Sequence, residues 1–228
     1  MEEFHYNYYF NIQDFSHKSL FTDCEFVWEP LSKIEDYLHK QELGFIDTYI
    51  PETVTLVNEE FISIGKGTVV EPGAYIKGPC IIGENCQIRQ GAYIRGNFIC
   101  GDSCVVGHGT EVKNSIFFNN AQAAHFAYIG DSILGNQVNL GAGTVCANLR
   151  FDKKPIRLFF NGRNVDTHLK KFGAIFGDFS QSGCNSVTNP GTLIGKRALV
   201  SPCSNAKGIV REGRVFYADG SIENVVHR

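Results

Sequence analysis

The sequence predicts an all-β solenoid, a parallel β-helix, because a six-residue repeat runs from about residue 62 to residue 149. The segments ISIGKG, TVVEPG, AYIKGP and CIIGEN show its character. A small residue usually stands first, an aliphatic residue stands third, and Gly, Asn, Pro and charged residues fill the last places. The first and third residues of a strand point to the same side, so these side chains face inward together. Three strands and three turns then make a coil of about eighteen residues.

Composition and charge narrow the class of protein. The 228 residues are 43% hydrophobic, which is enough for a large core. A net charge of −3 gives no reason to expect a nucleic-acid partner or a membrane surface. The start of the chain lacks a basic segment followed by an apolar run, and no stretch is long and apolar enough for a transmembrane helix. We therefore expect a cytoplasmic protein.

Four of the eight cysteines fall on inward places of the repeat. Cys80, Cys86 and Cys104 take the small first place, and Cys100 takes the aliphatic place. No two cysteines have the CxxC spacing that many zinc sites share. We therefore interpret these four as compact core residues rather than as metal ligands or disulfide partners, and the sequence requires no metal.

Residues 1–58 lack the repeat and are rich in aromatic side chains. From Pro30 onward, apolar residues recur at the spacing of one helix face, namely Leu31, Ile34, Tyr37 and Leu38. Because the open end of a solenoid is an exposed sheet edge, we expect residues 1–58 to form a small N-terminal α+β cap. A lid over a substrate site is the alternative.

Three cations follow the inward aliphatic residue in successive coils. Lys77, Arg95 and Lys113 are spaced eighteen residues apart, so coils that stack at about 4.7–4.9 Å place them in one column at an edge. Like charges this close repel each other, and an anion such as phosphate relieves the repulsion. The pattern favours an anion site at Arg95 and Lys113, whereas Lys77 fits a solvated turn.

His125 takes the same post-aliphatic place in the segment AAHFAY, so it should point outward from an edge. Phe126 and Tyr128 follow it closely, and Glu111 precedes it on a nearby turn. A neutral imidazole held by a carboxylate is a competent base near neutral pH. His125 and Glu111 are therefore candidates for acid-base catalysis, and an ordinary surface histidine is the alternative.

The repeat is interrupted at residues 150–172 and then returns to about residue 205. Asn161-Gly162 stands between two short extended runs, which is a strong signal for a β-hairpin. An insertion that projects from a rigid solenoid is a typical place for a binding loop. Residues 59–228 are therefore predicted to form one β-helix that carries this inserted hairpin loop and ends in a C-terminal cap.

Blocks of polar residues at set spacings carry a resemblance to a known family. The blocks are Glu111-Val112-Lys113, AHFAYIGD from Ala124, VNLGAGT from Val138 with Asn148, and GAIFGD from Gly173. They resemble the hexapeptide-repeat acyltransferases, in particular the C-terminal acetyltransferase domain of the bifunctional enzyme that makes UDP-N-acetylglucosamine. They are also similar to the equivalent domain of sugar-1-phosphate nucleotidylyltransferases. The resemblance implies a left-handed β-helix and a homotrimer whose sites lie between neighbouring subunits.

The resemblance also implies roles for individual residues. His125 would deprotonate the substrate amine as the amine attacks the acetyl thioester. The cosubstrate acetyl-CoA would contact Ala142 and Asn148. The sugar phosphate would be bound by Arg95, Lys113, Tyr128, Asn139 and Lys154. Two of these, Arg95 and Lys113, are the pair that the spacing of the cations indicates independently.

Two departures from the family pattern bear on the function. The chain lacks a nucleotidylyltransferase half, and Asp178 stands where the bifunctional enzyme has a Ser that helps to bind CoA. The expected function is transfer of an acetyl group from acetyl-CoA to a hexosamine 1-phosphate, similar to glucosamine 1-phosphate, in UDP-N-acetylglucosamine biosynthesis. The alternative is a non-catalytic trimer that binds a sugar phosphate or serves as the partner of a separate sugar nucleotidylyltransferase.

Overall fold

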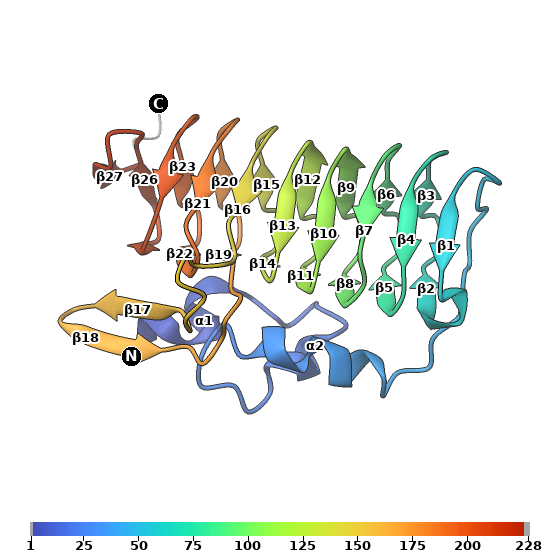
Figure 1. The fold of residues 1–228 in the computed structure, drawn as a ribbon, viewed down its shortest axis with the longest axis horizontal. Coiled ribbons are helices and arrows are strands. Elements are labelled where there is room, and N and C mark those ends of the chain that lie inside the picture. Colours follow the sequence, from blue (N-terminus) through green and yellow to red (C-terminus); the bar gives the residue numbers. More distant parts are fainter. Residues whose placement is uncertain (1, 226–228) are drawn as a thin grey trace.

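The computed structural model describes residues 2–225, which form a parallel β-helix with a helical segment along one side (Figure 1). The strands of the solenoid are short, and nearly all pair in parallel with a strand of the next coil. Among these residues, no helix has the length and apolar character that crossing a membrane requires. The β-solenoid that the six-residue repeat predicts is confirmed.

Within the described part of the chain, the solenoid strands form three sheets. Sheet 1 contains β1 (Thr55–Val57), β4 (Tyr75–Lys77), β7 (Tyr93–Ile94), β10 (Glu111–Lys113), β13 (Tyr128–Gly130), β16 (Val145–Cys146), β21 (Val187–Thr188) and β24 (Asn205–Ala206). Sheet 2 contains β2 (Ile62–Ile64), β5 (Cys80–Ile82), β8 (Phe98–Cys100), β11 (Ser115–Phe117), β14 (Ile133–Leu134), β19 (Ala174–Phe176), β22 (Thr192–Ile194) and β25 (Ile209–Val210). Sheet 3 contains β3 (Val69–Val70), β6 (Gln87–Ile88), β9 (Val105–His108), β12 (Gln122–His125), β15 (Asn139–Leu140), β20 (Gln181–Ser182), β23 (Leu199–Val200), β26 (Arg214–Phe216) and β27 (Ile222–Asn224).

Equivalent places of successive coils lie directly above one another. In sheet 1, Ile76 pairs with Ile94, and the column continues through Val112 to Ile129. All four side chains are fully buried, and each such burial contributes about 1.5–3 kcal/mol of hydrophobic stabilisation. The small and aliphatic places of the repeat therefore form the continuous core of the solenoid.

The inward cysteines belong to this core. Cys80, Cys86, Cys100 and Cys104 are all buried in the core, and the Sγ atoms of Cys86, Cys100 and Cys104 lie within 4.8 Å of one another. The thiol of Cys86 donates to the carbonyl of Gly101 at 3.2 Å, and Cys104 donates in the same way to the next coil. Burial raises the pKa of Cys80 to about 12, so this thiol stays protonated. The inward thiols act here as small side chains that also satisfy backbone carbonyls.

The N-terminal segment covers the outer face of sheet 2 (Figure 1). Its helical elements are η1 (Glu2–Phe4), α1 (Tyr6–Tyr9), η2 (Lys18–Phe21) and α2 (Pro30–Leu38). Phe10 and Phe15 stack on Phe118 of the solenoid, with ring centroids 4.8 and 4.1 Å apart. The predicted helix from Pro30 is confirmed, and it buries Leu31, Ile34 and Leu38.

This position corrects the expectation that residues 1–58 cap the open end of the solenoid. The outward residues of sheet 2 are unusually apolar, so this face needs a cover; they include Ile99, Ile116, Ile133 and Ile175. The stretch before β2, which includes η3 (Glu59–Phe61), meets the first coil, where Ile46 forms a bridge with Ile64. There, four apolar side chains pack partly buried against the inner core: Ile46, Ile50, Val54 and Leu56.

The insertion forms the predicted hairpin. Strands β17 (Arg157–Phe160) and β18 (Arg163–Asp166) pair in antiparallel fashion around Asn161 and Gly162. These two residues have φ values of 49° and 76°, as a tight hairpin turn requires. The hairpin packs on the N-terminal segment, because Ile156 and Leu158 join the same apolar cluster and Phe160 contacts the ring of Phe4.

Candidate functional site

Most of the predicted substrate ligands lie on or beside the outer face of sheet 1. Tyr93, Glu111 and Tyr128 occupy one outward row across β7, β10 and β13. Arg95 follows β7 and Lys113 ends β10, so the two cations are neighbours at the edge that joins sheet 1 to sheet 2, which we call edge 1–2. The stacking that the eighteen-residue spacing predicts is confirmed by this register.

Arg95 is held by a carboxylate in its own row. Its Nη1 donates to Glu111 Oε1 at 2.7 Å, and its guanidinium lies 5.9 Å from the ring centroid of Tyr93. The hydrogen bond with Glu111 raises the pKa of Arg95 above its usual value. Both partners of the ion pair are substantially exposed, so it contributes little to stability and serves chiefly to orient the guanidinium.

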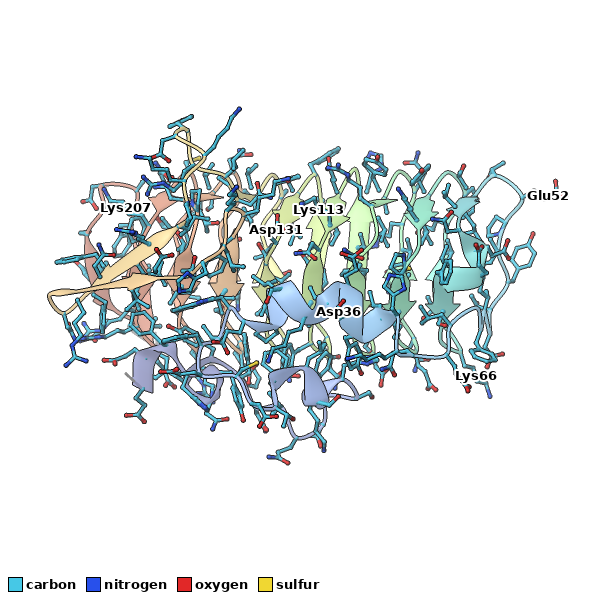
Figure 2. The ribbon with its side chains drawn as sticks, turned by 60° about the horizontal axis from the view of Figure 1, so that its bottom comes forward. Asp36, Glu52, Lys66, Lys113, Asp131 and Lys207 are labelled. Carbon is cyan, nitrogen blue, oxygen red and sulfur yellow. The ribbon has the colours of Figure 1, made fainter. Side chains whose placement is uncertain are left out.

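Lys113 is held by a second carboxylate, which the sequence analysis missed. Lys113 Nζ lies 3.1 Å from Asp131 Oδ2, and the Asp131 residue is only 4% exposed. Asp131 also accepts hydrogen bonds from Asn114 Nδ2 at 3.0 Å and from Asn148 Nδ2. Figure 2 shows Lys113 and Asp131 side by side at the edge of the solenoid. Asp131 is thus the buried centre of a polar network at edge 1–2.

Asn148 and Tyr128 complete this network. Asn148 Nδ2 lies 3.2 Å from the hydroxyl oxygen of Tyr128, and partial burial raises the pKa of that hydroxyl. The resemblance places Asn148 with acetyl-CoA, whereas the structure joins it to the group that contains Lys113. The one signal in the sequence for Asp131 is its position in the block AHFAYIGD, where the repeat is shortened.

His125 and Ala142 lie on another edge, which joins sheet 3 to sheet 1 and which we call edge 3–1. His125 ends β12 and is exposed, as predicted. Its backbone carbonyl accepts from the N–H of Gly143 at 3.0 Å, so the turn that contains Ala142 is the next one along this edge. Asn139 is on the outer face of sheet 3, two residues before that turn begins.

The structure does not join Glu111 to His125. Glu111 belongs to β10 of sheet 1 and His125 to β12 of sheet 3, and the Glu111 carboxylate binds Arg95 instead. The neighbour of His125 across the sheet is His108, whose Nδ1 lies 2.8 Å from the carbonyl of Gln90. The predicted contact between His125 and Glu111 is therefore absent within the described chain: Glu111 binds Arg95, and His125 is paired with His108.

The backbone geometry explains why glycine occupies both Gly141 and Gly143 in the segment VNLGAG. A Cβ on Gly141 would lie 2.5 Å from the backbone of Gly183 in the next coil, and Gly143 has a φ of +75°. Coils approach so closely at edge 3–1 that a side chain at Gly141 has no room. These residues therefore bring the backbones of successive turns together beside Ala142.

Asp178 lies on the third edge, which joins sheet 2 to sheet 3. Its buried carboxylate accepts from the N–H groups of Asn11 at 2.7 Å and Asn136 at 2.8 Å, and burial raises its pKa. Asp178 therefore anchors the N-terminal segment and lies on a different edge from Ala142. The residue that follows Ala142 along edge 3–1 is the exposed Cys184, because the N–H of Asn185 donates to the carbonyl of Ala142 at 2.7 Å.

Lys154 lies on the insertion and is exposed. Its N–H donates to the Asp152 carboxylate at 3.2 Å, and that carboxylate also pairs with Arg150. The predicted site residues thus form two groups within one chain, with Lys154 outside both. One group surrounds Asp131 at edge 1–2, and the other lies along edge 3–1 around His125.

The fold and these two polar groups define a hexapeptide-repeat β-helix of the kind that the sequence resembles. The chain belongs to the family described as the GMPPB C-terminal domain, which matches residues 76–203.

Two relatives show the extent of the similarity. Over 203 residues the chain is 34% identical to "Bifunctional protein GlmU" of Methanococcus maripaludis strain S2, which covers 89% of this chain and 48% of that protein. Over 106 residues it is 36% identical to "Bifunctional sugar-1-phosphate nucleotidylyltransferase/acetyltransferase" of Sulfurisphaera tokodaii, covering 46% of this chain and 26% of that protein. The chain therefore spans about half of the first relative and less of the second.

Among solved structures, the UDP-N-acetylglucosamine acyltransferase of Francisella novicida is 14% identical to the chain, with a TM-score of 0.49. The match covers 79% of this chain and 70% of that one.

Proposed function

We propose that the protein transfers an acetyl group from acetyl-CoA to the amine of a hexosamine 1-phosphate, as a homotrimer. The observation that carries this proposal is the pair of cations at edge 1–2. Arg95 and Lys113 are adjacent, and each is oriented by its own carboxylate. A phosphate beside them gains charge-assisted hydrogen bonds from two donors whose positions are already fixed.

The reaction needs a base and a place for the thioester. The amine nitrogen forms a bond to the carbonyl carbon of the thioester, and the bond between that carbon and sulfur breaks. The neutral ring of His125 takes the proton that the nitrogen loses and returns it to the departing thiolate. Ala142 lies on the turn next to His125, where the backbones of successive coils approach closely and leave a narrow surface for the acyl donor.

The separation of the two groups supports the trimer. Edge 1–2 carries the cations and edge 3–1 carries the base, so one chain alone presents them on different edges. In a trimer, edge 3–1 of one subunit can meet the outer face of sheet 1 of its neighbour, and the two halves of the site then face each other. Lys154, on the exposed insertion, is free in such an arrangement to reach a site that it does not reach within its own chain.

A second function has one observation in its favour. Glu111 is bound to Arg95, so within the chain it does not orient His125 for catalysis. A non-catalytic trimer that binds a sugar phosphate, or that accompanies a separate nucleotidylyltransferase, would need the cations and no base.

An acetyl-transfer assay over a panel of amino-sugar phosphates, with detection of free CoA, separates the two functions. Release of CoA that depends on the amino sugar and is lost in His125→Ala supports the enzyme. Sugar-phosphate binding by the wild type without any transfer supports the non-catalytic module.

A further inference from the structure

Edge 1–2 contains a cavity of about 390 Å³ that the proposed acceptor site does not fully use. Its lining includes all three cations of the column and a carboxylate of helix α2, namely Lys77, Arg95, Lys113 and Glu35. Helix α2 runs beside this edge, and Asn114 Nδ2 donates to the carbonyl of Leu31 in α2 at 3.3 Å (Figure 2). The N-terminal segment thus supplies one wall of the cavity.

The three cations of the cavity differ in their partners. Arg95 and Lys113 are paired with Glu111 and Asp131. Lys77 is exposed, and its side chain forms no ion pair or hydrogen bond with any of residues 2–225. It lies one coil before Arg95 in the register of sheet 1, which corresponds to a rise of about 4.8 Å. The cavity therefore has an unused positive charge at one end of an ordered row of cations.

Two carboxamide side chains of the cavity are also suited to binding an anion. Asn58 and Asn97 line it, and no hydrogen bond within residues 2–225 uses either side chain. Each carboxamide offers two N–H donors to the oxygen atoms of an anion. An acceptor with a single phosphate at Arg95 and Lys113 would leave both Lys77 and these donors without a partner.

We propose that this cavity binds a diphosphate group, with one phosphoryl group at Arg95 and Lys113 and the second at Lys77. The two phosphoryl groups of a diphosphate extend along the edge over a length comparable with one coil rise, so both reach a cation at once. This inference rests on the proposed function for the position of the first phosphoryl group. It assigns to the site a diphosphate-linked sugar or a nucleoside diphosphate in addition to a sugar monophosphate.

Glu35 allows a test in which two substitutions should change diphosphate affinity in opposite directions. Glu35 lines the cavity from α2, and its negative charge repels an anion that approaches Lys77. Removing the charge of Lys77 should weaken diphosphate binding, and removing the charge of Glu35 should strengthen it. Asp36 is the next residue of α2 and does not line the cavity, which makes it a matched control.

The experiment is isothermal titration of the full chain with inorganic phosphate, inorganic pyrophosphate and UDP. We expect pyrophosphate to bind about tenfold more tightly than phosphate, since one further charge-assisted contact forms. Lys77→Gln should lower pyrophosphate affinity about tenfold and leave phosphate affinity unchanged, while Glu35→Gln should raise pyrophosphate affinity. Lys66→Gln, at the edge between sheets 2 and 3, and Asp36→Asn should change neither. UDP that binds more tightly than pyrophosphate supports a nucleoside diphosphate as the ligand, and UDP that binds no more tightly shows that the site recognises the diphosphate group without a contact to the nucleoside.

Equal affinity for phosphate and pyrophosphate, or pyrophosphate binding that Lys77→Gln leaves unchanged, would overturn the diphosphate site. Acetyl transfer to hexosamine 1-phosphate is measured on the same preparations. Intact transfer without any preference for diphosphate refutes this inference alone, whereas preference for diphosphate without transfer refutes the proposed acetyl transfer alone.

Discussion

Replacing Asp131 by Asn should destabilise the protein far more than the matching change at Glu111. Asp131→Asn keeps the size of the side chain and removes the negative charge from a buried network. Lys113 Nζ lies 3.1 Å from the carboxylate, and the two side chains are 18% and 6% exposed. At that distance the Coulomb attraction is about 5 kcal/mol at an effective dielectric constant of ~20, before the cost of desolvation is subtracted.

The net effect follows from burial. Breaking a fully buried ion pair by removing one partner costs about 3–5 kcal/mol, and the partial exposure of Lys113 lowers this to about 2–3 kcal/mol. For a chain of this length, such a change in the free energy of unfolding lowers Tm by about 5–10 °C. The Arg95 and Glu111 side chains are 43% and 32% exposed. Glu111→Gln should therefore cost only about 0.2–1 kcal/mol.

Thermal and urea unfolding of the two variants, followed by far-UV circular dichroism, measure this difference. Both substitutions remove one carboxylate from an ion pair, but only Asp131 is buried and also accepts from Asn114 and Asn148, so the comparison measures the contribution of the buried network. Equal shifts of Tm for Asp131→Asn and Glu111→Gln would refute the reasoning that Asp131 is the buried centre of the network.

Three further predictions concern binding, catalysis and pH. Lys113→Ala and Arg95→Ala should each weaken sugar-phosphate binding by about 1.5–3 kcal/mol and leave acetyl-CoA binding nearly unchanged, as measured by calorimetry; equal losses for both ligands would contradict a phosphate role. His125→Ala should lower the rate of acetyl transfer by roughly 10²–10⁴-fold without a change in Tm, because the ring is exposed; near wild-type transfer would rule out His125 as the base. Burial lowers the pKa of His17 to about 4. Between about pH 6.5 and pH 4 the imidazole is therefore protonated in the unfolded chain and neutral in the folded chain. The free energy of unfolding should fall by at most ~3 kcal/mol as the pH drops through this range. Thermal melts over this pH range should show a shallower slope in His17→Gln, and an unchanged slope would assign the pH dependence to other groups.

The inward columns of the solenoid could be predicted because their physical cause is local. A strand of a few residues must place alternate side chains on opposite sides, so Ile76, Ile94 and Val112 can face the core only at a fixed period. The same period fixes which cations stack, and Arg95 and Lys113 are neighbours for that reason alone. Local geometry repeated in each coil therefore carries both the fold and half of the candidate site.

The location of the N-terminal segment could not be predicted from its composition. Its aromatic side chains show that it must bury a surface, but they do not say which one. The signal lay in sheet 2, where outward places such as Ile99 and Ile116 are apolar instead of polar. The exposed sheet edge at the open end of a solenoid favours a cap there, whereas the apolar outer face of sheet 2 is the larger surface that needs a cover.

The partners of the charged groups were the least predictable part of the site. The sequence places Glu111 on a turn near His125, whereas stacking brings it beside Arg95, sixteen residues away on the preceding coil. Asp131 lies in the shortened segment YIGDS, so the six-residue repeat does not indicate that this turn residue is buried. Contacts between side chains of adjacent coils depend on such local changes in the length of a repeat. A six-residue pattern describes the typical repeat and does not show these changes.

The covered face restricts how copies of this chain can associate. The N-terminal segment and the hairpin occupy sheet 2, so a second copy cannot approach that face without displacing a fully buried aromatic cluster. The outer rows of the other two sheets are polar and more exposed, with Tyr93 and Glu111 on sheet 1 and Gln122 and Asn139 on sheet 3. The proposed homotrimer would therefore use sheets 1 and 3 and the edge between them. That edge carries His125, so association through these faces would bring the proposed base of one subunit toward the cations of the next.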